Sequence, residues 1–231
     1  MNVIDSRRPA PLGLLALAAL FSALVALALS GGHEANAHGE APHAATTSGT
    51  YTAKQVAFRN EMRRLWEDHV TWTRLAVISL TTGSADTNAT VARLLRNQTD
   101  IGKAIASYYG RAAGDALTGL LREHILVAAD VIAAAKAGDS AKLAETQAAW
   151  SANGDEIALF LSKANPRSWK PAAMRAMLRE HLRLTTAEVV ARLQGRWAAD
   201  VVAYDRIHRQ ALEMADMLAA GIERQFPARF R

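Results

Sequence analysis

Three short stretches of the sequence share one pattern: two large apolar residues, two charged residues and then a histidine. They are residues 65–69 (LWEDH), 120–124 (LLREH) and 177–181 (MLREH). On helical spacing, each histidine lies in line with apolar residues three, four and seven positions away, so all three are predicted to face a core. A core that receives a histidine from three equivalent positions indicates a repeated structural unit.

The repeated unit is predicted to be a helical hairpin. About thirty residues after His69 and His124, and somewhat sooner after His181, the sequence carries an amide or carboxylate followed by isoleucine. These segments are residues 97–101 (NQTDI), 153–157 (NGDEI) and a shortened third copy at 204–207 (YDRI). Each hairpin therefore pairs a histidine-bearing helix with a helix that carries a polar partner.

Glycine, proline and short polar residues interrupt the helical pattern at regular intervals. They divide the body, residues 51–227, into six expected helices at about 51–82, 87–109, 113–137, 140–163, 168–194 and 197–224. No stretch shows sustained alternation with period two, so no sheet is expected. Three hairpins with short connections predict an all-α antiparallel helical bundle of about six helices. Residues 228–231 are expected to form a basic tail.

The first 37 residues have the layout of an export signal: a short basic region, an apolar run at 12–29 and a small-x-small site at 35–37. An exported, periplasmic or extracellular protein is expected. Because the apolar run is barely long enough to span a bilayer, an uncleaved membrane anchor is the alternative. Residues 38–50 are interpreted as a flexible tether, in which His38 and His43 form a weak candidate metal site.

The composition restricts the classes of function. The 231 residues include no cysteine, which excludes a lipoprotein, a disulfide framework, thiolate metal ligands and cysteine nucleophiles. The net charge of +5 comes from basic residues scattered among acidic ones. This pattern predicts modest affinity for anionic surfaces, compatible with association with the cell envelope, and no nucleic-acid partner.

Further short motifs lie along the body. They are residues 65–74 (LWEDHVTWTR), 93–97 (RLLRN), 109–110 (YG), 165–166 (NP), 204–205 (YD), 214–216 (MAD) and 225–227 (QFP). With them, the chain resembles a poorly characterised bacterial family of all-helical proteins, some of which carry the names glycosyltransferase or acetylglutamate kinase. The resemblance implies a helical fold and supplies no catalytic residues. The sequence has neither the Gly-rich phosphate loop nor the strand–helix alternation that the chemistry behind those names requires.

The buried histidines allow a structural interpretation. Each of His69, His124 and His181 would hydrogen-bond an amide or carboxylate on a neighbouring helix, which satisfies buried polar atoms and sets the register of the helices. The candidate partners are Asn97, Asp100, Asn153, Asp155, Glu156 and Asp205. Burial keeps such an imidazole neutral unless a carboxylate compensates its charge.

They also allow a functional interpretation, because a neutral imidazole is a good metal ligand and bundle interiors often contain metal sites. Zinc, copper or iron would suit three histidines with one or two carboxylates. The predicted ligand set is His69, His124, His181, Asp100, Glu156 and Asp205. The body lacks the two Glu-x-x-His motifs of di-iron proteins, which argues against ferritin-like chemistry.

Three functional hypotheses follow. The leading one is an exported, non-enzymatic binding protein whose core histidines and neighbouring polar groups bind a metal or a small ligand. The alternative is a structural or interaction module of the cell envelope, in which the histidines only join helices. The third is an enzyme acting on an envelope substrate, which would need an open cleft joining a histidine, an aspartate and Arg74.

Overall fold

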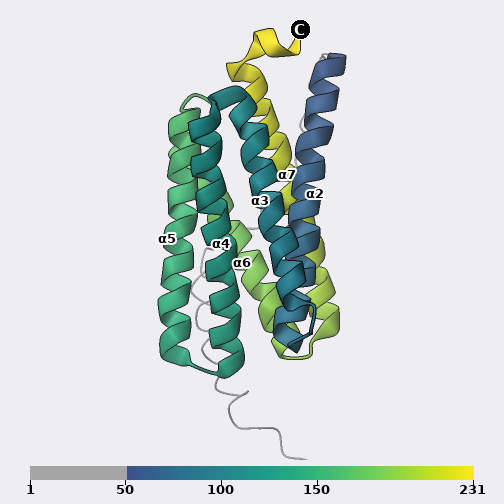
Figure 1. Cartoon of the computed structure of the whole chain (residues 1–231), viewed down its shortest axis with the longest axis vertical. Coiled ribbons are helices and arrows are strands. Elements are labelled where there is room, and N and C mark those ends of the chain that lie inside the picture. The colour runs from purple at the N-terminus through teal and green to yellow at the C-terminus, as the bar shows by residue number, and fades with distance from the viewer. Residues whose placement is uncertain (1–50) are drawn as a thin grey trace, which may run out of the picture.

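A computed structural model describes residues 51–231 (Figure 1). The signal at 1–37 and the tether at 38–50, with His38 and His43, lie outside the described residues. The described part forms six α-helices and a short 3₁₀-helix, without strands. Their bounds are α2 (Ala53–Thr82), α3 (Thr87–Tyr109), α4 (Arg111–Ala137), α5 (Ser140–Ala164), α6 (Pro171–Leu193), α7 (Trp197–Gln225) and η1 (Pro227–Phe230).

The helices form the predicted all-α bundle. They run up and down along the long axis of the molecule, so that neighbours in the chain are antiparallel (Figure 1). Each helix packs against the next, and α7 returns to pack against α2. Helix α2 also contacts α4 and α6, the first helices of the other two hairpins. Three hairpins therefore close around one core.

Caps explain where α2 and α5 begin and where α2 and α4 end. A capping box at Thr52 begins α2, and Asp139 accepts a hydrogen bond from the amide of Lys142 at the start of α5. Gly83 and Gly138 end α2 and α4 with φ values of 73° and 71°, in the left-handed region that glycine adopts without steric cost.

One helix start differs from the expected position. Helix α6 begins at Pro171 and not near residue 168. Proline fits the first helical position because its missing N–H has no partner there in any helix. The residues before it form a turn that buries Trp169 to 1% exposure.

The last residues fold back on the bundle. Residues 228–231 were expected as a basic tail, but η1 places Phe230 in the core at 4% exposure. Its ring packs 5.1 Å from that of Phe58 and 5.7 Å from that of Tyr108, measured between centroids. Thr52 Oγ1 donates a hydrogen bond of 2.6 Å to the Phe230 carbonyl, which ties the end of the chain to the start of α2.

Among residues 51–231, no helix combines the length and the apolar character that crossing a bilayer requires.

Glycine permits a close approach of α3 to α4. A Cβ atom on Gly102 would lie 1.9 Å from Thr118 Oγ1 and 2.7 Å from the Gly114 carbonyl oxygen. We therefore expect Gly102→Ala to push the two helices apart and lower the free energy of unfolding by about 1–3 kcal/mol. Chemical denaturation measures the change.

Gly119 provides the matched control. It also lies inside α4, but a Cβ atom there would meet no other heavy atom within 4 Å. Gly119→Ala should raise stability by about 1 kcal/mol through helix propensity alone. Equal effects of the two substitutions would contradict close packing at Gly102.

Candidate functional site

The three repeated histidines converge in the core. His69 comes from α2, His124 from α4 and His181 from α6, so each hairpin contributes one ring from its first helix. The three residues are 9%, 4% and 6% exposed. The ring centroid of His181 lies 5.9 Å from that of His69 and 6.1 Å from that of His124. The sequence predicted burial of these residues, and the structure brings them together.

In the second and third hairpins, a side-chain amide 29 residues later holds the ring. His124 Nδ1 lies 2.9 Å from Asn153 Oδ1, and His181 Nδ1 lies 3.1 Å from Gln210 Oε1. Because an amide oxygen only accepts hydrogen bonds, Nδ1 donates in both pairs. In a neutral imidazole this leaves Nε2 as an acceptor with a free lone pair.

A backbone carbonyl fixes the orientation of each of these amides. The Asn153 amide nitrogen donates to the Leu120 carbonyl at 3.1 Å, and that of Gln210 donates to the Met177 carbonyl at 3.2 Å. Both carbonyls belong to the residue one helical turn before the histidine. Since the NH₂ group must face the carbonyl, the amide oxygen must face the ring. One amide thus joins two helices and sets a histidine tautomer.

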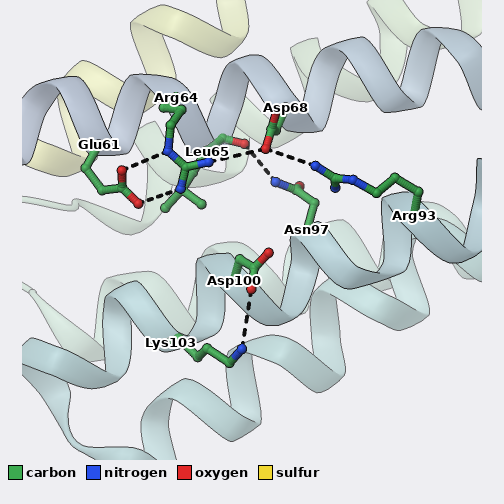
Figure 2. Close-up of polar contacts among 8 residues, drawn as sticks. All are labelled: Glu61, Arg64, Leu65, Asp68, Arg93, Asn97, Asp100 and Lys103. Carbon is green, nitrogen blue, oxygen red and sulfur yellow. Dashed lines mark hydrogen bonds and ion pairs between the residues drawn. The ribbon is translucent and has the colours of Figure 1, made fainter.

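The first hairpin uses two amides in place of one. Asn97 Nδ2 donates to the Leu65 carbonyl at 3.0 Å, the same link as in the other hairpins (Figure 2). Gln98 Nε2 lies 3.2 Å from His69 Nδ1, and the Leu94 carbonyl and Asn97 Oδ1 also lie within its hydrogen-bonding distance. Two amide hydrogens therefore face three acceptors. Gln98 Oε1 is buried with no hydrogen-bond partner among the described residues.

The three rings line a single cavity of about 50 Å³. No hydrogen bond to their Nε2 atoms occurs among residues 51–231. The remaining wall is apolar except for Gln98, and it includes no carboxylate. Its apolar residues are Trp66, Ile101, Ile105, Leu117, Leu121, Ile157, Leu161, Leu178, Ala211, Met214 and Leu218. A cavity of this size accommodates a metal ion or a few waters, and is too small for a haem or a lipid.

Burial lowers the pKa of all three histidines, because removal from water disfavours the charged imidazolium. The pKa of His69 falls to about 3 and that of His124 to about 4. The pKa of His181 is lowered for the same reason. Repulsion from His181 adds to the shift of the other two, and the amide hydrogen bonds oppose it. At neutral pH all three rings are therefore neutral.

The carboxylates of the predicted ligand set do not line the cavity. Asp100 lies in a surface groove between α2 and α3 and pairs with Lys103 at 3.4 Å (Figure 2). Glu156 and Asp205 are exposed. A helix turns about 100° per residue, so Asp100 and Glu156, three residues after the inward-facing amides, point about 60° away from them.

The third copy of the repeat is at Gln210 and not at residues 204–207. Asp205 lies five residues before Gln210, which places it about 140° around α7. The missed signal was the constant spacing: positions 98, 153 and 210 each follow their histidine by 29 residues.

Arg74 belongs to a different buried cluster. Its guanidinium contacts Glu188 at 2.6 Å and Asp200 at 2.8 Å, and Arg192 contacts Asp200 at 2.9 Å. Burial raises the pKa of Glu188, an effect that Arg74 opposes. Arg74 is not among the residues that line the histidine cavity.

Within residues 51–231, no group of three or more His, Cys, Asp or Glu side chains is arranged so that it could hold a metal ion. A scan against protein-family models, a search of curated proteins and a search of solved structures found no match to the chain. The resemblance drawn from the sequence motifs stays a prediction.

The lowered histidine pKa values predict a loss of stability in weak acid. Below pH 6.5, the usual pKa of histidine, the unfolded chain binds protons on these rings, whereas in the folded core the rings stay neutral. Each buried histidine should therefore cost about 1.4 kcal/mol per pH unit as the pH falls from 6.5 toward its folded pKa. Denaturant titrations at several pH values from 7 to 5, above the range where ordinary carboxylates titrate, measure this slope.

Two variants serve as a matched pair. His124→Gln removes one titrating core ring and should reduce the slope by about a third. His208→Gln removes a half-buried histidine that pairs with Glu67 at 2.7 Å outside the core, and should leave most of the slope in place. Stability that is constant between pH 7 and 5 would show that the core rings are not held neutral.

Proposed function

We propose that this protein is an exported, non-enzymatic binding protein that holds one transition-metal ion between His69, His124 and His181. The observation that carries the proposal is the arrangement of the rings: three buried histidines face one small cavity, and their Nε2 atoms lack hydrogen-bond partners among the described residues. Three neutral imidazoles from separate helices form a suitable donor set for zinc, copper or iron.

The amides support the proposal from outside the ligand shell. Metal-binding histidines usually donate their other ring N–H to a carbonyl or carboxylate, which fixes the tautomer and the direction of the ring. Asn153 and Gln210 provide such acceptors at 2.9 and 3.1 Å. For His69 the nearest group is the Gln98 amide nitrogen, a donor 3.2 Å from Nδ1, so coordination through His69 Nε2 requires the Gln98 amide to turn its partnerless Oε1 toward the ring.

Metal binding requires a small contraction of the site. With metal–nitrogen bonds of about 2.0–2.1 Å, the ring centroids would stand about 5.2 Å apart in tetrahedral and about 5.5 Å apart in trigonal geometry. The two measured separations are 5.9 and 6.1 Å. In these two pairs the rings must therefore approach by about 0.4–0.9 Å, since among the described residues the side chains as they stand form no group that could hold a metal ion.

The structural interpretation is the second candidate. It is favoured by the amide bonds, since Asn153 and Gln210 already satisfy Nδ1 of their histidines and a main-chain carbonyl. Histidines that only set the helix register would need no common cavity, however. This interpretation assigns no role to the Nε2 atoms or to Gln98 Oε1.

A metal titration of the purified full-length chain tests the proposal. After chelator treatment, the protein should bind one equivalent of Zn²⁺, Cu⁺ or Fe²⁺ with a dissociation constant below about 1 μM, and the bound metal should raise the melting temperature. Single substitutions of His69, His124 or His181 by Gln should weaken binding by at least about 100-fold. Elemental analysis after dialysis gives the stoichiometry.

His208→Gln is the control, because His208 lies outside the cavity, paired with Glu67. It should bind metal as the natural chain does. Failure of all three metals to bind below about micromolar concentration would refute the proposal. Core variants that lose stability but keep their metal affinity would support the structural interpretation instead.

A further inference from the structure

We infer that the ion this core selects is Cu(I), held by the three imidazoles together with the thioether of Met214. The inference rests on the proposed function and specifies its ligand. It depends on three features of the cavity wall: its lack of negative charge, the position of one methionine in the repeat, and the separation of the rings.

The first feature is charge. The wall of the cavity consists of imidazoles, one amide and apolar side chains, and Asp100, Glu156 and Asp205 lie elsewhere. An ion bound there has no counter-charge in contact with it. Since the idealised Born cost of burial rises with the square of the charge, a divalent ion is about fourfold more costly than a monovalent one. The site therefore disfavours Zn²⁺ and Fe²⁺ relative to Cu⁺.

The second feature is a break in the threefold pattern. Four residues after Asn97, Asn153 and Gln210, the three hairpins place Ile101, Ile157 and Met214 on the cavity wall. Ile157 and Met214 follow their histidines by 33 residues and Ile101 follows His69 by 32, so the three residues occupy the corresponding turn of their hairpins, and only the third carries a sulfur atom. Met214 is 9% exposed, so its side chain lies in the core.

A thioether is a soft, uncharged ligand that favours Cu(I) over harder divalent ions. Because the chain contains no cysteine, the thioether of methionine is the softest donor that it offers. A methionine where the other two hairpins have isoleucine adds this donor to the histidines without adding charge. Imidazole is itself a good copper ligand, so the four side chains form one consistent donor set.

The third feature is space. Cu(I) needs no bound water, and with Met214 as a weak axial ligand the three imidazoles keep a near-trigonal arrangement, which needs the wider ring spacing of about 5.5 Å. That value is the closer one to the measured 5.9 and 6.1 Å. A cavity of about 50 Å³ with apolar walls leaves little room or hydrogen bonding for the waters that a hydrated divalent ion would bring.

Competition titrations of the full-length chain test the inference. Under anaerobic conditions, Cu(I) is titrated against bicinchoninate, and Zn²⁺ is titrated separately against a chromophoric zinc chelator. The natural chain should bind Cu(I) at least about 100-fold more tightly than Zn²⁺. Met214→Ile, which restores the residue of the other two hairpins, should weaken Cu(I) binding about tenfold and change Zn²⁺ binding by less than about twofold.

Met217→Leu is the matched control, because Met217 is a partly buried methionine of α7 that does not line the cavity. It should leave both affinities unchanged. X-ray absorption at the copper edge gives a readout that does not depend on stability: a Cu–S contribution should be present in the natural chain and in Met217→Leu, and missing in Met214→Ile.

The outcomes separate this inference from the function on which it rests. Zn²⁺ binding as tight as that of Cu(I), or a copper spectrum without sulfur in the natural chain, overturns the Cu(I) assignment and leaves a three-histidine metal site standing. Absence of binding by either metal overturns both.

Discussion

The core depends on one recurring link, a side-chain amide that bonds a histidine and a main-chain carbonyl at the same time. Asn153 receives a hydrogen bond from His124 and donates one to Leu120, one turn earlier on the same helix. His124 is buried, so removing the amide would leave its Nδ1–H without a partner, at a cost of about 1–3 kcal/mol. Sliding one helix along its partner would break both hydrogen bonds together. The link therefore sets the register of the two helices in the hairpin as well as the orientation of the histidine ring.

A second buried polar cluster acts between hairpins. Arg74 of α2 contacts Glu188 of α6 and Asp200 of α7, and Arg192 adds a second cation. Two carboxylates and two guanidinium groups balance in charge, which makes their burial tolerable. The cluster binds the first hairpin to the third, where α7 meets α2. The amide links thus join the two helices within each hairpin, and the ion cluster joins the first hairpin to the third.

The repeat explains why a site can arise at the centre. Each hairpin presents its histidine one turn after the carbonyl that orients the amide, so closing three hairpins around one core brings the three rings together. In the proposed site the departures from symmetry would supply the chemistry: Gln98 adds an unpaired acceptor in the first hairpin, and Met214 adds a thioether in the third.

The sequence alone determined the helices, because their signals are local. Period-3.6 patterns, the glycines at 83 and 138 and the polar caps act within a few residues, and they also predicted that His69, His124 and His181 face inward. Local spacing could not identify which polar residue faces each histidine, because a shift of one residue turns a side chain by about 100° around the helix. In the third hairpin the sequence pattern indicated Asp205, whereas the residue that contacts His181 is Gln210.

That the three rings line one cavity follows from the tertiary structure and not from the local sequence. The same holds for the composition of its wall, which includes Met214 and no carboxylate. Which helices meet at the centre depends on how the hairpins close around one another. That closure depends on contacts between residues far apart in the chain, and local sequence patterns do not predict such contacts.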